Sequence, residues 1–348
     1  MYLYHSTQLT LKLITNNLNS FGRIFKVSIF GESHGECVGI TIDGCPAGLL
    51  LSPEDLAADL ERRKGGKQKG TTPRQEEDLP IFKSGLFNGK TTGFPITILF
   101  ENKNIRSEDY TKQRSIPRPG HADWVAHQKF GGNEDFRGGG HFSARLTAGI
   151  VAAGAIAKKL MKDIRIHAEV IEIAGEKDLE KGLQKAIDAK DSVGGILECK
   201  VNGLPVGLGE PWFDSVESSL AHLVFAIPAV RGVEFGTGFA AAGMFGSEHN
   251  DAILEMGGKT KTNHAGGVVG GITNGNELVF RLAIKPTSST PREQESLNWD
   301  TEQVEKFSIK GRHDLCVALR APVIVEAVTA LVLVDFMMIE QKIKKVLS

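Results

Sequence analysis

Hydrophobic residues alternate with polar ones in several short stretches of the chain, which is the pattern of strands with one buried face. In residues 24–30 the side chains of Phe25, Val27 and Ile29 share one face, and a glycine follows directly. We predict a strand there that ends at the glycine, so that His34 lies where the strand leaves the sheet. Further strands are predicted over 94–100, 196–201 and 278–284.

The segment Ser52-Pro53-Glu54-Asp55 has the features of a helix start, with a hydroxyl cap, a proline in the first turn and acidic side chains after it. Leu56 and Leu60, four residues apart, supply the buried face of this helix. The helix runs into the basic triplet Arg62-Arg63-Lys64 and is expected to end at Gly65-Gly66. Because the helix dipole favours cations at this end, the triplet is either a solvated cap or part of an anion site.

Two longer stretches are apolar on nearly all sides and are predicted to be buried helices. The first covers 143–161 and is rich in alanine, and the second begins at Pro322 and extends to about residue 346. Glu326 and Asp335 interrupt the second where a membrane-spanning helix would not tolerate a charge, so no membrane span is expected.

Strands and helices are mixed along the chain without a repeated βαβ unit, which favours one α+β domain. No GxGxxG follows the first strand, which argues against a dinucleotide-binding Rossmann fold. Residues 1–18 lack the features of a signal peptide and are expected to be a poorly ordered extension before a single domain at 19–348.

The overall charge limits the kinds of partner. The 348 residues include 41 Lys and Arg against 42 Asp and Glu, a formal net charge of −1. This balance argues against a general nucleic-acid or membrane-surface binder, which needs a net positive field. The four cysteines do not have the spacing of a zinc site, and a reduced cytoplasmic protein without a bound metal is expected.

Candidate chemistry gathers in five segments in which glycine or proline frames a titratable or anion-binding side chain. They are GESHG (31–35), RPGHAD (118–123), RGGG (137–140), KPTSS (285–289) and GRHD (311–314). Glycine frees the backbone there, which suits proton transfer to a highly charged small molecule. His34 and His121 can act in such transfer, unless each ring only bonds its own turn. Of the neighbours His313 and Asp314, one is expected to face the cleft.

Several cationic side chains in or near these segments could hold phosphate or carboxylate. The guanidinium groups of Arg63, Arg118, Arg145 and Arg312 can bind such anions in a bidentate manner. The glycine-rich segment 65–72 is expected to be a basic flap that orders over an anion. The KPTSS run offers an ammonium and three hydroxyls, which suit a phosphate or a cofactor edge, although a hydroxyl-rich turn explains them too.

Taken together, these segments resemble the chorismate synthase family. The resemblance extends from about residue 19 to the C-terminal helix and includes, in order, FGESHG (30–35), RR with a basic glycine loop and TT (62–72), RPGHAD (118–123), RGGG and SAR (137–145), GLGEP (207–211), NHAGG (263–267), KPTSS (285–289) and GRHD (311–314). It implies a lyase that removes phosphate from 5-enolpyruvylshikimate 3-phosphate by anti-1,4-elimination to give chorismate, in aromatic amino-acid biosynthesis. It also implies reduced FMN as cofactor without net redox change, a homotetramer, and a single-domain β-α-β sandwich with helices packed between antiparallel sheets.

Residue roles follow from the same resemblance. His34 matches the histidine that protonates the departing phosphate, His121 the one that protonates reduced flavin, and Asp314 the acid that assists proton removal at the flavin N5. Substrate contacts are implied for Ser33, Arg63, Lys69, Arg118 and Arg145. FMN contacts are implied for His141, Phe142, Ser143, Pro228, Ala229, Gly270, Lys285, Pro286, Thr287, Ser288, Ser289 and Arg312.

Four positions depart from the family pattern, namely Lys69, His141, Leu146 and Leu315. Members of the family often have Arg at the first two, an acid at the third and Pro at the fourth. Lys69 keeps the positive charge but loses the bidentate fork, and His141 would make its ligand contacts depend on pH.

Three functions compete at this point: an FMN-dependent phosphate lyase, a phosphate-ligand binding protein without turnover, and an RNA-binding module that uses the basic loop 62–69. The retained His34, His121 and Asp314 favour the lyase, and the basic loop lacks the interleaved aromatic side chains of an RNA-binding surface. Because no dedicated nicotinamide domain is recognisable, we expect an external flavin reductase. NADPH would be required only if the enzyme reduces the flavin itself.

Overall fold

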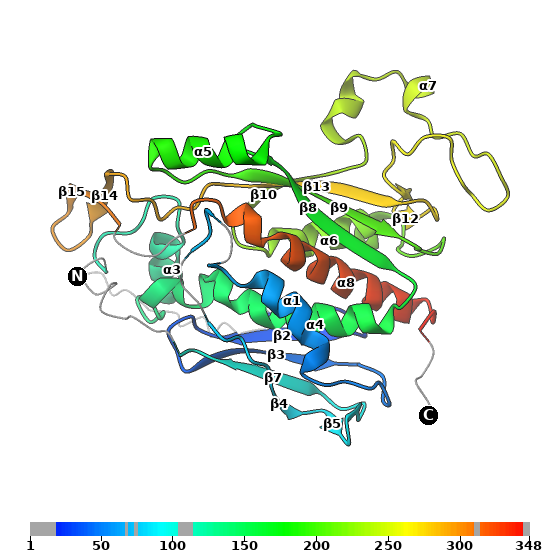
Figure 1. Ribbon diagram of the computed structural model, residues 1–348, viewed down its shortest axis with the longest axis horizontal. Helices are drawn as coiled ribbons and strands as arrows, with labels where there is room; N and C mark the ends of the chain where they lie inside the picture. Colours follow the sequence, from blue (N-terminus) through cyan, green and yellow to red (C-terminus); the bar gives the residue numbers. More distant parts are fainter. Residues whose placement is uncertain (1–18, 67–68, 73–75, 104–113, 310–313, 344–348) are drawn as a thin grey trace, which may run out of the picture.

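The computed structural model describes residues 19–66, 69–72, 76–103, 114–309 and 314–343 (Figure 1). The predicted extension at 1–18 lies outside these ranges. Helices and strands are mixed along the described chain, as the α+β prediction requires, and every strand pair described is antiparallel.

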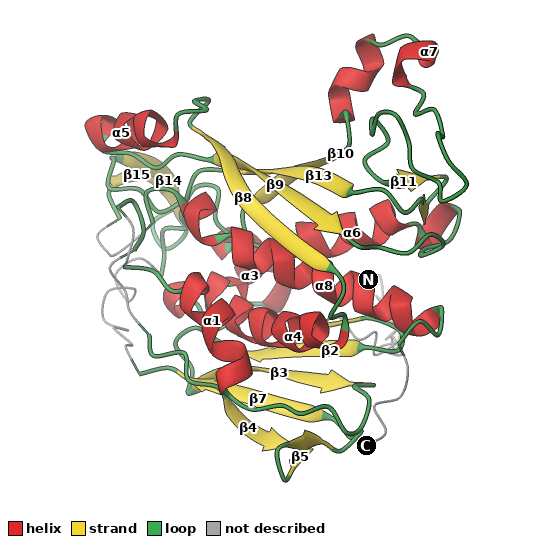
Figure 2. Cartoon of the chain, turned by 45° about the vertical axis from the view of Figure 1, so that its right-hand side comes forward, coloured by secondary structure: helices red, strands yellow, loops and turns green. Residues whose placement is uncertain are grey.

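Two larger sheets lie on opposite sides of a group of helices (Figure 2). The first has the order β1 (Ser20–Phe21), β2 (Lys26–Gly31), β3 (Cys37–Asp43), β7 (Ile96–Glu101) and β4 (Ile81–Ser84). The second has the order β10 (Val230–Phe235), β13 (Leu278–Ile284), β9 (Gly195–Asn202) and β8 (Arg165–Ile173). Three short hairpins complete the described strands: β5 (Leu86–Phe87) with β6 (Lys90–Thr91), β11 (Val268–Val269) with β12 (Ile272–Thr273), and β14 (Gln294–Asn298) with β15 (Gln303–Phe307).

The described α-helices are α1 (Glu54–Arg63), α3 (Asp123–Phe130), α4 (Thr147–Leu160), α5 (Leu179–Ala189), α6 (Val216–Phe225), α7 (Gly246–His249) and α8 (Pro322–Ile339). Short 3-10 helices cover η1 (Arg137–Phe142), η2 (Ala144–Leu146), η3 (Trp212–Asp214), η4 (Gly238–Gly243) and η5 (Val317–Arg320). Between the sheets, α4 packs against the first sheet and against α8, and α8 packs against the second sheet (Figures 1 and 2).

Small residues set the close approach of the central elements. A Cβ on Gly149 of α4 would lie 2.9 Å from Cβ of Ile40 in β3, and one on Gly154 would lie 2.4 Å from Cβ of Ala327 in α8. Both contacts leave no room for a larger side chain, so α4 lies close to the sheet on one side and to α8 on the other.

Most of the predicted elements are confirmed, with shifted ends. The strands β2, β7, β9 and β13 lie at the predicted places, and Leu56 and Leu60 of α1 are buried. The first strand begins at Lys26 rather than at residue 24 because the amides of Ile24 and Phe25 donate to the carboxylate of Asp335 instead of to a neighbouring strand.

The two apolar helices are found, but both are shorter than predicted. α4 starts at Thr147, not at residue 143, because the Ser143 hydroxyl accepts the amide of Arg145 and starts a 3-10 turn first. α8 stops at Ile339, not near 346, because the apolar stretch ends there and Gln341 adopts a left-handed φ of 53°. By length and composition α8 could cross a membrane, but 83% of it is buried inside the protein, which confirms a core helix.

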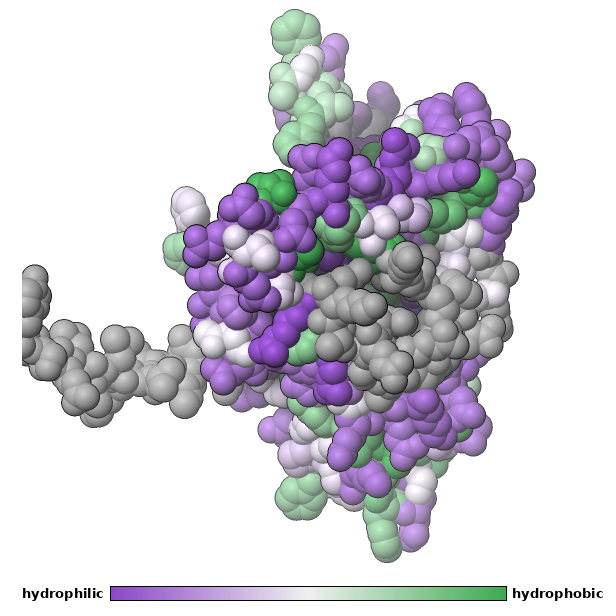
Figure 3. Space-filling model, turned by 90° about the vertical axis from the view of Figure 1, so that its left-hand side faces the viewer, coloured by the Kyte–Doolittle hydropathy of each residue, from purple (hydrophilic) through white to green (hydrophobic). Residues whose placement is uncertain are grey.

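The surface is polar over much of the face in Figure 3, and apolar side chains gather at the top and bottom of that view. The upper projection belongs to the segment around η4 and α7, which exposes Phe239, Phe245 and Met256. The lower one belongs to the hairpin β5–β6, which exposes Phe87. These projections lie away from the cavity described next.

Candidate active site

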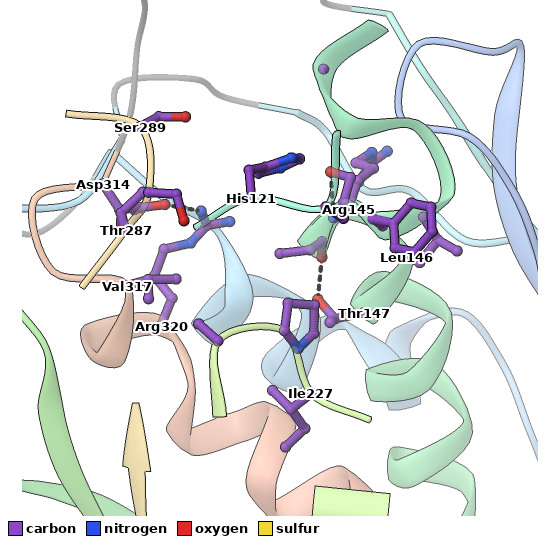
Figure 4. Close-up of a pocket in the computed structure, with 18 of the residues that line it drawn as sticks. His121, Arg145, Leu146, Thr147, Ile227, Thr287, Ser289, Asp314, Val317 and Arg320 are labelled. Atoms are coloured by element: carbon purple, nitrogen blue, oxygen red, sulfur yellow. Dashed lines mark hydrogen bonds and ion pairs between the residues drawn. The ribbon is translucent and has the colours of Figure 1, made fainter. Parts of the chain in front are cut away.

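A cavity of about 830 Å³ opens among segments that are far apart in the sequence. Its walls come from the end of α1, the loop before α3, the turns before α4, the loop between α6 and β10, the loop after β13, and η5. Figure 4 shows Asp314 and Arg320 on one side of this space, Arg145 and Thr147 on the other, His121 between them and Ile227 below. The volume is that of a site for a small-molecule ligand or cofactor.

Positive charge dominates the described lining of the cavity. It includes the seven cationic side chains Arg63, Lys64, Arg118, Arg145, Arg231, Lys285 and Arg320. The acidic side chains of the same lining are the three of Glu76, Asp78 and Asp314. Because the whole chain is nearly neutral, this excess of four charges is local and fits ligands with several negative charges.

Two of the predicted anion-binding arginines share one buried carboxylate. The carboxylate of Asp78 accepts from Nη2 of Arg63 and from Nη1 of Arg145, and its side chain is fully buried. Burial opposes the charge, but the two guanidinium groups overcome it and hold the pKa of Asp78 below its usual value. Arg145 also donates to Oδ1 of Asn102 at 3.0 Å, so it is held rigidly at the cavity wall.

Of the basic triplet, Arg63 is 4% exposed, and Arg62 donates through both terminal nitrogens to Glu326 on α8, each at 2.7 Å. The solvated-cap interpretation is therefore wrong for Arg63, whereas the Arg62 side chain is 45% exposed and is solvated as well as paired. The triplet divides: Arg62 pairs with Glu326 on α8, and Arg63 and Lys64 line the cavity.

His121 is oriented by a carboxylate from its own loop. Nδ1 of His121 lies 2.5 Å from Oδ1 of Asp123, and Asp123 also accepts from Nε and Nη2 of Arg118, each at 2.7 Å. Burial opposes ionisation of Asp123, but these hydrogen bonds hold its pKa well below the usual range. A proton on Nδ1 is thus directed to Asp123, and Nε2 stays available for exchange.

His34 is buried behind the RGGG turn. Oγ of Ser33 lies 3.1 Å from Nδ1 of His34 and donates to the carbonyl of Arg137 at 3.2 Å. A Cβ on Gly138 would lie 2.1 Å from Cε1 of His34, and one on Gly139 would lie 3.2 Å from Cε1 of His121. Two adjacent glycines therefore contact both histidine rings, and both rings line one cavity.

Asp314 lies on the side of the cavity away from Arg145, and both of its carboxylate oxygens accept hydrogen bonds. Its Oδ1 accepts the amide of Thr72 at 2.8 Å, and its Oδ2 accepts Nη1 of Arg320 at 3.1 Å (Figure 4). Arg320 also donates to the carbonyl of Arg63 at 3.1 Å. The predicted partner position His313 lies outside the described residues, so the question of which neighbour faces the cleft is answered only for Asp314, which lines the cavity.

The KPTSS loop packs against the loop that carries His121. Nζ of Lys285 donates to the carbonyl of Gly120 at 2.5 Å and to Oγ of Ser288 at 2.9 Å, and burial lowers the pKa of Lys285. Oγ1 of Thr287 is buried and has no hydrogen-bond partner in the described chain. A ligand at this wall would meet an unpaired hydroxyl and a desolvated ammonium.

The remaining predicted residues separate into three groups. Phe142, Ser143, Pro228, Ala229, Pro286 and Ser289 line the cavity, as does His141, whose Nδ1 lies 2.9 Å from the carbonyl of Gly31. Lys69 instead bonds Gln184 of α5 at 3.3 Å, and Gly270 lies in the β11–β12 turn, so neither is part of the cavity lining. Arg312 lies outside the described residues.

Three residues that position this site were not predicted from the sequence: Asp78, Asp123 and Arg320. Asp123 belongs to the quoted RPGHAD segment, so its spacing of two from His121 was a usable signal. Asp78 and Arg320 lie in no such segment, and nothing local in the sequence indicates their partners.

Comparison of the chain with known proteins shows the family to which it belongs. A family model described as chorismate synthase matches residues 25–338, which is most of the chain. The chain belongs to the chorismate synthase family. A chorismate synthase from Chitinophaga pinensis is 66% identical over 330 residues, covering 94% of this chain and 99% of that relative.

More distant members of the chorismate synthase family agree. One from Dehalococcoides mccartyi is 44% identical over 348 residues, covering 91% of this chain and 96% of the relative. A solved structure described as the crystal structure of chorismate synthase matches with a TM-score of 0.69 and 26% identity, covering 92% of this chain and 93% of that chain. The predicted family is thus confirmed.

Proposed function

We propose that the cavity is the active site for the family's reaction, elimination of phosphate from 5-enolpyruvylshikimate 3-phosphate to give chorismate. The family's enzymes are lyases of the shikimate pathway, which is the function predicted from the motifs. The observation that carries the proposal is that His34, His121 and Asp314 line one cavity with an excess of positive charge. Departure of a phosphate needs both a proton donor and local cations.

His34 is proposed as the group that gives a proton to the departing phosphate. It is 4% exposed, so a proton on its ring is not lost directly to bulk water. Ser33 and Gly138 both lie against the Nδ1–Cε1 edge of the ring. Arg63, Arg118 and Arg145 are proposed to hold the anionic groups of the substrate.

The cavity fits reduced FMN as the second ligand. The unpaired hydroxyl of Thr287 and the desolvated ammonium of Lys285 suit its polar groups, and the apolar side chains of the lining suit its ring system. These apolar residues are Ile29, Leu146, Ile150, Ile227, Val230 and Val317. When bound, reduced FMN supplies the electron chemistry that these side chains lack. His121 holds a proton for it, and Asp314 takes part in proton removal.

Anaerobic incubation with chemically reduced FMN and 5-enolpyruvylshikimate 3-phosphate tests this function. We expect release of inorganic phosphate together with chorismate. His121→Ala should lower kcat by about 10²-fold or more, the usual scale for a lost acid or base group. Absence of both products from the unaltered protein would contradict the proposal, and tight binding of both ligands without turnover would favour the non-catalytic alternative.

The assembly and the compartment belong to the same proposal. We propose that residues 19–348 form one catalytic domain with the family's β-α-β layering, that four copies form a homotetramer, and that the protein is cytoplasmic. The four cysteines are free thiols, as a reducing compartment allows. Light scattering of the purified chain measures the oligomeric state, and a monomer would contradict it.

An external reductase is proposed as the source of reduced flavin. Spectroscopic measurement of FMN reduction by NADPH with this protein alone tests that point. Bleaching of the flavin absorbance without another protein would show that the enzyme reduces its own cofactor.

A further inference from the structure

A second, smaller cavity adjoins His121. Its volume is about 40 Å³, and it shares Arg118, His121, Ala122 and Phe142 with the wall of the main cavity. A cavity needs about 10–15 Å³ of such volume, together with polar partners, to hold a water molecule. The imidazole of His121 is therefore part of the partition between a large cavity that suits ligands and a small one that suits water.

Glu134 supplies an unpaired polar atom to this second cavity. Its Oε1 lies 3.4 Å from Nδ1 of His127, whereas its Oε2 is buried and has no hydrogen-bond partner in the described chain. A buried carboxyl oxygen in this position is best satisfied by water. The side chain of His127 is 35% exposed, so the pair connects the solvent with the second cavity.

The ring of His121 can be reached from this side. Its Nδ1 is engaged by Asp123, which leaves Nε2 for exchange. A Cβ on Gly139 would lie 3.3 Å from this Nε2, and Gly139 lines the second cavity. Because Gly139 has no side chain, the Nε2 edge of the ring is not covered at that point.

Glu134 differs from the other carboxyl groups of the second cavity in its partners. The titratable groups that face it there are Arg114, Arg118, His121, Asp123, His127 and Asp135. Hydrogen bonds from Arg118 and Arg137 keep Asp123 and Asp135, respectively, as carboxylates. Glu134 has no guanidinium partner in the described part of the chain.

We propose that Glu134, His127 and a water molecule in the second cavity form a proton relay that reloads His121. The relay rests on the proposed function, in which His121 delivers a proton inside the main cavity. With ligands filling that cavity, Nε2 of His121 gives its proton to an acceptor there. The water then gives a proton to Nε2, and a solvent proton that passes through the imidazole of His127 and the carboxylate of Glu134 replaces it on the water. One solvent proton replaces each proton delivered, and no oxidant or reductant is involved.

The test compares Glu134→Gln with Glu180→Gln, a matched change of an exposed side chain on α5, in the anaerobic assay with reduced FMN. Glutamine keeps the shape of Glu134 and one acceptor oxygen for His127, but it cannot carry the proton. We expect Glu134→Gln to lower kcat about tenfold, less than the 10²–10⁴-fold typical of the acid itself, with KM unchanged. Added formate, a small proton carrier, should restore much of the loss, and Glu180→Gln should behave as the unaltered protein.

An unchanged kcat for Glu134→Gln would overturn the relay, and so would a loss that formate does not restore. If the lower kcat of Glu134→Gln is explained by unfolding of the variant at the assay temperature, shown by a lower Tm, Glu134 has a structural role and the relay is overturned. His127→Asn gives an independent check, because it should show the same rescue by formate. Failure of the unaltered protein to release phosphate would overturn the proposed function and the relay together.

Discussion

Gly138 and Gly139 make direct contact with the two candidate catalytic histidines. Their φ angles are 61° and 94°, values that an L side chain rarely adopts. A methyl group on Gly138 would occupy the position of the His34 ring, with Cβ 2.1 Å from Cε1. The glycines of the RGGG segment therefore allow the backbone to pack directly against the two imidazole rings.

Gly138→Ala should inactivate the enzyme by displacing His34. We expect kcat to fall by about 10²-fold or more, as for loss of an acid group. Gly175→Ala is the matched control, because Gly175 has a φ of 78° but a Cβ there would meet no atom within 4 Å. Steady-state kinetics and Tm of both variants measure the effect. Equal losses in the two would show that backbone strain, and not contact with His34, is responsible.

Asp123→Asn should reduce turnover through His121. The neutral amide of asparagine is a weaker acceptor for the N–H at Nδ1 of His121 than the carboxylate is. The orientation of the ring and the position of its proton are then no longer fixed. We expect kcat to fall by about 10²-fold, the lower end for lost acid–base function, with KM changed less. The pH profile of kcat is the decisive measurement. A profile identical to that of Asp214→Asn, which alters an exposed ion pair with Arg23, would exclude this role.

At the scale of elements, α8 joins the two sheets through two buried carboxylates. Glu326 accepts both terminal nitrogens of Arg62 on α1 and Nζ of Lys158 on α4, and it also accepts the amide of Ala168 on β8. Near the other end, Asp335 accepts three consecutive amides, those of residues 23–25, at 2.7–2.9 Å. These two carboxylates thus connect α8 to α1, α4, β8 and the start of β2.

Asp335→Asn should loosen the entry into β2. Asp335 offers two oxygens to three amide donors, whereas an asparagine offers only one oxygen. At least one of the three amides therefore loses its acceptor. Hydrogen bonds to charged groups contribute about 1.5–3 kcal/mol, and we expect the free energy of unfolding to fall by about that amount. Urea unfolding followed by circular dichroism measures it, with Asp188→Asn on the exposed face of α5 as the control. A change no larger than that of the control would contradict the role of Asp335.

At the scale of the whole molecule, buried ion pairs make stability depend on pH. Burial opposes the charge of Asp78, Asp123 and Glu326, yet their cationic partners hold all three pKa values below the ordinary ones. A carboxyl group with a depressed pKa in the folded state adds stability above its unfolded pKa. That stability is lost as the pH falls through the folded value.

We therefore expect the urea midpoint to be steady from neutral pH to about pH 5 and to fall steeply below about pH 4, near the pKa of unfolded carboxyl groups. Asp78→Asn should lower the urea midpoint at pH 7, since two buried guanidinium groups lose their shared partner. The further fall of the midpoint below about pH 4 should be smaller in this variant. A midpoint that does not change between pH 7 and pH 3 would contradict this account of the buried pairs.

Local patterns in the chain were enough to predict much of this protein. The alternation at Phe25, Val27 and Ile29, the buried face of α1 at Leu56 and Leu60, and the continuous apolar stretch of α8 each depend on neighbouring residues, so the sequence alone determines them. The hydroxyl cap predicted at Ser52 is wrong, because the N-cap of α1 is Pro53 and makes no side-chain cap hydrogen bond. The short segments around His34 and His121 likewise indicated the chemistry and the family. Their backbone requirements are encoded within a few residues.

Only the tertiary structure decided which charges meet. Asp78 pairs with Arg63 and Arg145, and Asp314 accepts the amide of Thr72, across separations of 15, 67 and 242 residues, respectively. The ends of α4 and α8, the distance of Lys69 from the cavity and the second cavity beside Glu134 were also set by packing. A local pattern fixes the conformation of its own residues, but the partner of a buried charge depends on how distant elements pack together.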